Sequence, residues 1–430
     1  MLSKQTARET VRKLVSYTKN YAKVSIWNDG DNLTRFANSE IHQNVEIENI
    51  SVGLTVYNGR KEASCSTNVL TEEGLRDLAA DADALLALSP DTEYDVIELQ
   101  GGEVRDAVND ERLAEAFGVT KRAEIIKSCI ETLDPDFTAS GVLNLNNNMY
   151  ALGDSNGIFK YYSFDSADFN AVVTHKDGAA GYGETGSHNL DNIDIAKAFK
   201  SACEKAKMAV NPQFADIGAY TVILEPAAVA GLMGFVLGGL SGAGILRETS
   251  FAAGKLGEKI FGDNITLRDD LSSPVAQPVY FDGEGYAHKP MTFIEKGVIR
   301  GFYYDGKTAQ KSGVEPTGQA FWGAGSLTME GGNSSLEEMI KSTKRGLLIT
   351  RFHYTNYVNP KKLQVTGLTR DGTFMIEDGK IAYPVNNMRF TEDMISAFSN
   401  VAALSKELTK AGGLFPAAKI ENFHFTGGQK

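Results

Sequence analysis

Residues 226–246 read PAAVAGLMGFVLGGLSGAGIL, and no charged side chain interrupts them between Glu225 and Arg247. About 20 residues of this kind are long enough to span a bilayer. Glycine recurs along the stretch, however, and the pair Gly238-Gly239 is typical of a helix end. We therefore expect a buried helix followed by a glycine-rich turn, packed close to another backbone or to a ligand, and no membrane span.

Strand-like patterns dominate on both sides of this stretch. Apolar and polar residues alternate with a period close to two, which predicts antiparallel sheets with one solvated face. The runs of the middle region show it, at residues 138–145, 149–152, 158–164 and 168–175, and further strand-like runs are residues 22–27, 50–57, 220–225, 298–304 and 347–352. We expect a turn at residues 146–148, helices capped by Ser3 and Thr71, and a final helix that begins at Thr391. The predicted fold class is α+β: an N-terminal α/β-mixed region followed by strand-rich middle and C-terminal regions with antiparallel sheets.

The length of 430 residues predicts two or three domains at about 150 residues per domain. Residues 91–109 are rich in acidic and turn residues and are interpreted as a linker. We therefore divide the chain into an N-terminal α+β domain (residues 1–100), a middle strand-rich domain with a terminal helix (residues 110–215) and a C-terminal domain (residues 219–430).

The composition excludes several classes of protein. Hydrophobic residues make up 42% and charged residues 23%, as in globular proteins. The formal net charge of −12 repels phosphate and argues against a protein whose main role is to bind DNA or RNA. The cysteines (Cys65, Cys129, Cys203) are too few and too far apart for a disulfide framework or a structural zinc module. With no apolar signal sequence at its start, we expect a cytoplasmic protein.

Two local motifs could carry chemistry. Gly301-Phe-Tyr-Tyr-Asp-Gly306-Lys307-Thr308 matches the P-loop pattern, but its bulky interior favours an extended strand over a phosphate-binding loop. Asp282, Glu284 and His288 place two carboxylates and an imidazole within a short segment. A turn with solvated acids explains these three residues more simply than a catalytic site.

Several ordered segments resemble the TldD/PmbA family, long called modulators of DNA gyrase. They are VILEP (222–226), TSFAAGKLGE (249–258), FDGEG (281–285), FIEKGV (293–298), KRGLL (344–348) and IEDGKIAYPV (376–385). The segment RFAN (35–38) and the helix from Thr71 also fit, so the resemblance covers nearly the whole chain.

This resemblance implies a two-subunit peptidase system whose TldD-type member is a zinc metallopeptidase. Such a member carries a His-Glu-x-x-x-His helix and a further cysteine ligand near its C-terminus, and its dimers enclose a cavity for small or unfolded peptides. Carried over to this sequence, the histidines fall at Met233 and Gly238 and the catalytic glutamate at Gly234, and residues 407–418 contain no cysteine. Neither thioether nor glycine can replace imidazole as a zinc ligand. The chain is thus similar to the PmbA/TldE branch, and we expect no catalytic residue, metal ligand or cofactor in it, with zinc only in a catalytic partner.

Our first hypothesis is a metal-free, non-catalytic subunit that binds extended peptide by β-augmentation. Its partner would be a TldD-like catalytic subunit or a second copy of itself in a dimer, with no direct contact to nucleic acid or membrane. The residues expected to form the wall of the former active site are Gly231, Met233, Gly234, Gly238, Arg247, Ser250 and Phe251. One alternative is a stand-alone homodimeric hydrolase with a dispersed site at Asp282, Glu284 and His288. Another is a binding or regulatory module that acts without proteolysis.

Overall fold

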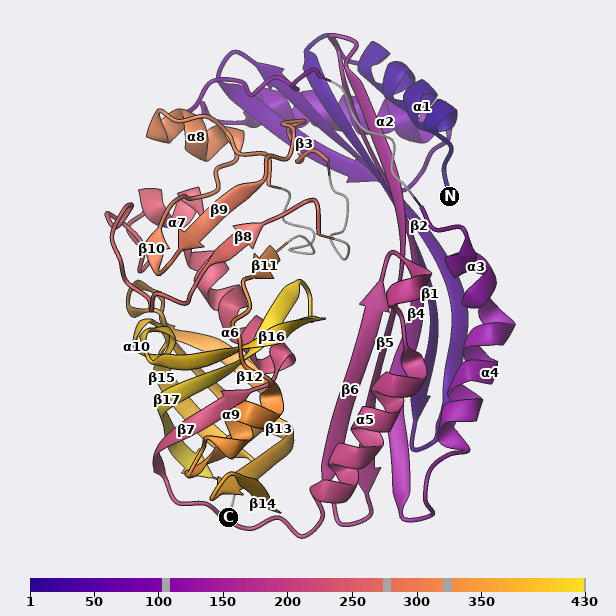
Figure 1. Cartoon of the computed structure of the whole chain (residues 1–430). Helices are drawn as coiled ribbons and strands as arrows, with labels where there is room; N and C mark the ends of the chain where they lie inside the picture. The colour runs from indigo at the N-terminus through magenta and orange to yellow at the C-terminus, as the bar shows by residue number, and fades with distance from the viewer. Residues whose placement is uncertain (103–108, 274–279, 320–326, 429–430) are drawn as a thin grey trace.

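The N-terminal half of the chain is built on one sheet. The structure, a computed structural model, describes residues 1–102, 109–273, 280–319 and 327–428. The sheet is antiparallel, with the strand order β3-β2-β1-β4-β5-β6 (Figure 1). Its strands are β1 (Tyr21–Ala37), β2 (Glu40–Asn58), β3 (Lys61–Thr67), β4 (Phe137–Asp154), β5 (Phe159–His175) and β6 (Ala180–Ser187). Because β1 pairs with β4 along most of its length, the segments that we expected as separate domains, residues 1–100 and 110–215, share a single sheet.

The helices of this half cover one face of the sheet. They are α1 (Lys4–Ser16), α2 (Glu72–Leu88), α3 (Arg112–Ala116), α4 (Val119–Ile130), the short 3₁₀ helix η1 (Leu190–Asn192) and α5 (Ile195–Met208). Ser3 and Thr71 cap α1 and α2 through their side-chain hydroxyls, as the sequence predicts. One apolar cluster lies under α1 and α2 and a second lies under α3, α4 and α5.

The expected turn at residues 146–148 is wrong, because β4 runs without a break through Asn146, Asn147 and Asn148. Side-chain amides in this run bond across the sheet: Asn147 Nδ2 donates to Asp165 Oδ1 at 2.9 Å, and Asn146 Nδ2 donates to Asp168 Oδ2 at 3.0 Å. The sheet is polar here because its apolar clusters lie on either side of this middle section. Asparagine therefore signals a cross-strand ladder at this place and not a turn.

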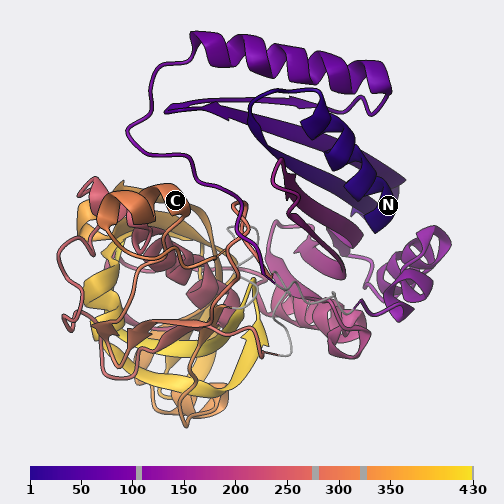
Figure 2. The same cartoon turned by 90° about the horizontal axis from the view of Figure 1, so that it is seen from above.

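The C-terminal half forms a second, mixed sheet that closes on itself. Its strands follow the order β10-β9-β8-β11-β17-β15-β13-β12-β7, with β14 beside β13 and β16 beside β17. A further pairing of β17 with β7 closes β7, β12, β13, β15 and β17 into a ring (Figure 2). The strands are β7 (Gly218–Leu224), β8 (Leu267–Asp269), β9 (Met291–Glu295), β10 (Val298–Ile299), β11 (Leu327–Met329), β12 (Arg345–Asn359), β13 (Gln364–Glu377), β14 (Lys380–Pro384), β15 (Met388–Asp393), β16 (Val401–Lys410) and β17 (Leu414–Gly428).

Short helices join these strands. They are α6 (Pro226–Gly239), α7 (Gly242–Leu246), α8 (Gly306–Ser312), α9 (Leu336–Lys341), the 3₁₀ helix η3 (Pro360–Lys362) and α10 (Met394–Ser399). Ser335 and Glu338 form a capping box at the start of α9. The predicted helix start at Thr391 is wrong, since this residue lies in β15 and Asp393 caps α10. Among the helices in the described ranges, none has the length and apolar character needed to cross a membrane.

The fold class is α+β, as the sequence predicts, and its sheets are antiparallel apart from the parallel pairings of β7 with β12 and of β11 with β17. The second sheet and its largest apolar cluster begin with β7, close to the predicted boundary at residues 215–219. The open face of the N-terminal sheet packs against the C-terminal half through an aromatic cluster that includes Tyr150, Tyr162 and Phe281.

Candidate functional site

The glycine-rich helix α6 has one buried and one exposed side. Pro226 occupies its first turn, where its missing N–H is not needed. Its buried residues are Ala228, Val229, Leu232, Met233 and Val236, which join the apolar cluster of the ring. The helix predicted from the uncharged stretch is therefore confirmed, and it is followed by the short helix α7.

Three glycines share the exposed side of α6. Gly231, Gly234 and Gly238 recur three and four residues apart, which places them on one helix face. Among the described residues, a Cβ atom built at Gly231 or Gly234 would meet nothing within 4 Å, and one at Gly238 would meet only the Tyr357 hydroxyl, at 3.2 Å. Glycine in an exposed helix interior costs about 1 kcal/mol relative to alanine. Packing within the chain thus gives no reason for glycine at positions 231 and 234.

An aromatic rim borders this face. The Tyr357 hydroxyl donates to the Phe235 carbonyl at 2.5 Å, and the two rings lie edge to face with centroids 4.8 Å apart. Tyr354 and Val358, from the same end of β12, are exposed by 73% and 52%. Among the described strands, β12 pairs on one side with β7 only as far as Ile349. Beyond Ile349, no described strand pairs with this side of β12, which is the side where β-augmentation would add a strand.

Met233 does not belong to the exposed face. Its side chain is fully buried, roughly a quarter turn away from Gly234. The positions to which the resemblance carries the zinc ligands and the base of a TldD-type helix thus hold a buried thioether and two glycines without side chains. Within the described ranges, no group of three or more His, Cys, Asp or Glu side chains is placed to hold a metal ion. The residues present on α6 do not fit a zinc site of this kind.

Ser250 and Phe251 hold the end of α6. The Ser250 hydroxyl donates to the Gly239 carbonyl, and the buried Phe251 ring packs so close to Gly239 that an added Cβ would lie 2.3 Å from it. Arg247 follows α7 and is exposed. Of the residues predicted for the wall, Gly231, Gly234 and Gly238 share one open face, whereas Met233, Ser250 and Phe251 are buried behind or beside it.

The dispersed site does not assemble as the alternative hypothesis requires. His288 Nε2 lies 2.5 Å from Asp269 Oδ2, so the imidazole is paired with a residue outside the predicted set. Asp282 accepts from the backbone N–H groups of Glu284 and Tyr286 at 2.9 Å each. Asp282 is 7% exposed, so the expectation of a solvated acid is wrong for this residue.

Burial also changes the pKa values of the two carboxyl groups in this turn. Desolvation raises the pKa of Asp282 to about 6, and it raises the pKa of Glu284, whose carboxylate accepts from Gly306 N. The positively charged side chains that face them are Lys23, Lys160 and Lys307, and Asp305 adds a negative charge. Sequence analysis missed this group. Lys23 lies between the buried residues Ala22 and Val24 in an alternating strand, so it is on the face of the sheet that is turned toward the other half of the chain. Its charge at that position is the one signal in the sequence that could have indicated this group.

The P-loop match is not a phosphate-binding loop. Strand β10 ends at Ile299, and α8 begins inside the motif at Gly306, capped by the Asp305 side chain. The predicted extended strand over residues 298–304 is therefore too long. Lys307 pairs with Glu62 of β3 at 2.7 Å and does not point into a glycine-rich turn.

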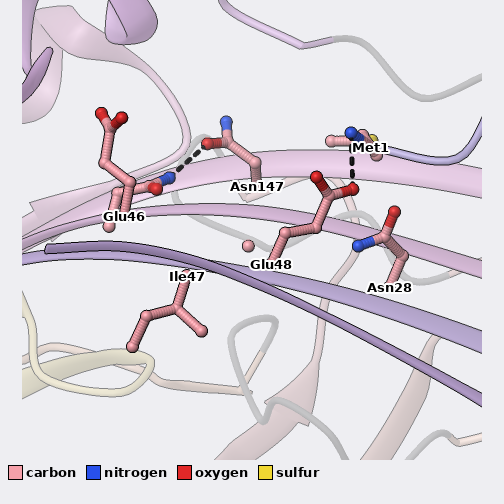
Figure 3. A pocket seen from close by; sticks show the side chains of 8 residues that line it. Met1, Asn28, Glu46, Ile47, Glu48 and Asn147 are labelled. Carbon is pink, nitrogen blue, oxygen red and sulfur yellow. Dashed lines mark hydrogen bonds and ion pairs between the residues drawn. The ribbon is translucent and has the colours of Figure 1, made fainter. Parts of the chain in front are cut away.

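A polar pocket of about 320 Å³ lies at the middle of the N-terminal sheet (Figure 3). It is lined by Met1, Asn28, Gly30, Asn32, Glu46, Ile47, Glu48 and Asn147. The Met1 amino group pairs with Glu48 at 2.7 Å, and Asn32 donates to Asn147 at 2.8 Å. These polar groups bond mainly to one another, and none of the predicted site residues lines the pocket.

Comparison with known proteins finds two family domains in this chain, one in each half. Residues 217–427 match the PmbA/TldA metallopeptidase C-terminal domain, and residues 31–86 match the PmbA/TldA metallopeptidase domain 1. The metalloprotease PmbA of Escherichia coli O157:H7 is 22% identical over 389 residues, which covers 84% of each chain.

Solved structures share the fold. The structure of TldE from Thermococcus kodakarensis aligns with a TM-score of 0.88 and 21% identity, covering 98% of this chain and all of the other. A protein from Thermotoga maritima titled a modulator of DNA gyrase aligns with a TM-score of 0.85 and 20% identity, covering 99% and 100% of the two chains. At such identities the structural likeness shows the fold alone. The two domain matches and the full-length relative together show that this chain belongs to the PmbA/TldD family of metallopeptidase-related proteins.

Proposed function

We propose that this chain is a metal-free, non-catalytic subunit of a TldD/TldE-type peptidase, which binds extended peptide along the glycine face of α6 and docks a zinc-bearing partner. The observation that carries the proposal is the exposed face of Gly231, Gly234 and Gly238 at the helix where a TldD-type enzyme would hold its metal. Side chains that could bind zinc or activate water are replaced there by open backbone.

The surroundings of this face support an extended peptide as its occupant. A strand added to the open edge of β12 would lie about 4.8 Å from it, within reach of α6. Glycine lets another backbone approach a helix closely, and main-chain hydrogen bonds tolerate many sequences. Exposed aromatic side chains such as Tyr354 would supply apolar contacts to the peptide's side chains.

The test is a mixing experiment with metal analysis. The purified chain alone is expected to hold no stoichiometric zinc and to leave unstructured peptides intact. Addition of a TldD-type homologue that carries the His-Glu-x-x-x-His motif should produce peptide hydrolysis above that of the homologue alone. Tightly bound zinc together with hydrolysis by this chain alone would refute the proposal.

The same experiment separates the non-proteolytic alternative. A regulatory module would bind without changing hydrolysis by the homologue, whereas a peptidase subunit changes it. The dispersed hydrolase site is not proposed further, because the structure pairs His288 with Asp269, a residue outside that set.

A further inference from the structure

The two halves of the chain meet along a seam that is held by a strap, residues 89–101. Figure 2 shows this segment leaving α2 and running between the halves. Its Tyr94 hydroxyl donates to Glu62 Oε1 at 2.7 Å on the N-terminal side. On the C-terminal side, Gln100 N donates to the Glu284 carbonyl at 3.2 Å, and Asp95 N donates to Gln310 Oε1 at 2.8 Å. The strap therefore binds both halves at once.

Charged side chains from both halves face one another at the seam. Lys307 Nζ pairs with Glu62 Oε1 at 2.7 Å, and Lys160 Nζ donates to the Gly285 carbonyl at 2.7 Å. Lys23 Nζ lies 5.0 Å from the centre of the Tyr57 ring, and in the described part of the chain this ammonium has neither a hydrogen bond nor an ion pair. The second carboxylate oxygen of Glu62 is buried and likewise lacks a partner among the described residues.

These pairings are incomplete for an interface in which Asp282 and Lys160 are buried. Buried ionised groups cost free energy unless partners compensate for the lost water. Asp282 illustrates this cost, because its carboxyl lies in the seam and, among the described residues, backbone N–H groups bond to only one of its oxygens. The groups that act on it are Glu284 and Tyr286 of its own turn, Asp305 beside α8, Lys23 of β1, Tyr150 of β4 and Lys160 of β5.

We propose that the seam is a proton-operated latch: it holds the two halves tightly while Asp282 is protonated and loosens when Asp282 and Glu284 are both ionised. Opening the seam returns the two carboxyl groups to water, where their charged forms are stable. The latch is a property of the chain alone and does not depend on the proposed peptidase function.

The direction of the pH dependence follows from linkage. Burial raises the pKa of Asp282 to about 6 in the closed seam, from an ordinary value of 3.8. A raised carboxyl pKa favours the closed form at low pH, and this contribution is lost as the pH rises through about 6. Glu284 is shifted in the same direction. Glu62, whose pKa is lowered, acts in the opposite direction, but its contribution changes only below pH 5.

Amide hydrogen exchange measures this opening directly. The reporters are the amides of Leu99, which donates to the Tyr21 hydroxyl at 2.9 Å, and of Gln100, which donates across the seam. Protection factors, corrected for the intrinsic pH dependence of exchange, should fall by up to about tenfold per pH unit between pH 5 and pH 6 and level off above pH 7. Amides of β1 under α1, such as that of Val24, serve as internal controls and should not change.

The variant Asp282→Asn gives the matched control. Its side-chain carbonyl can still accept from both backbone N–H groups, and it cannot ionise. Protection at Leu99 and Gln100 should then stay high and nearly independent of pH from 5 to 7. Glu284→Gln keeps an acceptor for Gly306 N, and in this variant the protection of Leu99 and Gln100 should depend on pH less strongly than in the unaltered chain.

Two outcomes would overturn the latch. One is equal protection of Leu99 and Gln100 at pH 5 and pH 7 in the unaltered chain. The other is a pH dependence that persists unchanged in Asp282→Asn.

Discussion

A fully buried arginine, Arg122 of α4, has no acidic partner in direct contact among the described residues. Its guanidinium donates to the Phe117 carbonyl at 2.8 Å, to the Thr34 hydroxyl at 3.2 Å and to the Val45 carbonyl at 3.2 Å. The bonds to Thr34 and Val45 join α4 to β1 and β2, and the bond to Phe117 reaches the end of α3. The buried positive charge is tolerated because hydrogen bonds from an ionised donor are stronger than those from a neutral donor.

Arg122→Met should therefore lower the free energy of unfolding by about 3 kcal/mol, since three acceptors lose their donor and two of these bonds are buried. Denaturant unfolding followed by circular dichroism measures the change. The control is Arg76→Met on the exposed side of α2, where an ion pair with Glu72 lies in water and should contribute little. Equal stability of the two variants would show that the buried bonds contribute nothing.

Substitution of two glycines of α6 by alanine should change the free energy of unfolding in opposite directions. Gly234→Ala adds a methyl group to open space and should raise the free energy of unfolding by about 1 kcal/mol. Gly239→Ala forces a methyl group against the buried Phe251 ring and should lower it by about 2 kcal/mol. Thermal unfolding of both variants beside the unaltered chain gives the comparison. If both variants lose stability, the face at Gly234 is not open in the protein.

At the scale of elements, the positions of helix starts could be predicted from the sequence more accurately than the ends of strands. Caps at Ser3, Thr71 and Ser335 are local signals, because one side chain bonds a backbone N–H within the next few residues. Strand continuity through Asn146 depends instead on partners in β5, which no local window contains. The sequence likewise placed a helix at residues 226–239, but which side of it is exposed depends on the ring of strands that encloses its apolar residues.

Close packing of α5 on β6 depends on two glycines. A Cβ at Gly183 would lie 1.9 Å from the Ala198 carbonyl oxygen, and one at Gly181 would lie 2.2 Å from that of Ala202. Gly183→Ala should push the helix off the sheet and lower the free energy of unfolding by about 3 kcal/mol. Chemical denaturation measures this loss, and Ala80→Gly on the exposed side of α2 provides a control for a simple change of helix propensity. A loss no larger than that of the control would contradict the packing.

Across the whole molecule, the halves meet at a second place far from the strap. The Arg351 guanidinium of β12 lies over the Tyr182 ring of β6, with its carbon 3.9 Å from the ring centre, and it also pairs with Asp371. Neither strand alone indicates this contact, since it joins residues more than 150 positions apart. For the same reason, the group of residues around Lys23 and Glu284 could not be predicted from the spacing of residues along the sequence. The segments that resemble the family could be recognised, because each of them is continuous in the sequence.

A double-mutant cycle tests this second contact. Arg351→Lys keeps a positive charge for Asp371 but loses the flat stacking surface, and Tyr182→Leu removes the ring. The two changes should couple by about 0.5–1 kcal/mol in the free energy of unfolding. Strictly additive effects would mean that the halves do not meet through this pair.

Peptide binding to the glycine face of α6 is the central claim for the molecule as a whole. Its most direct measurement is a fluorescence titration of a labelled unstructured peptide with three forms of the chain: unaltered, Gly234→Leu and Ala80→Leu. Both leucines stand on exposed helix surface, so neither should unfold the protein. We predict that Gly234→Leu weakens binding by at least about tenfold, or 1.4 kcal/mol, while Ala80→Leu matches the unaltered chain. Equal affinity of all three forms would place the peptide elsewhere and contradict the account.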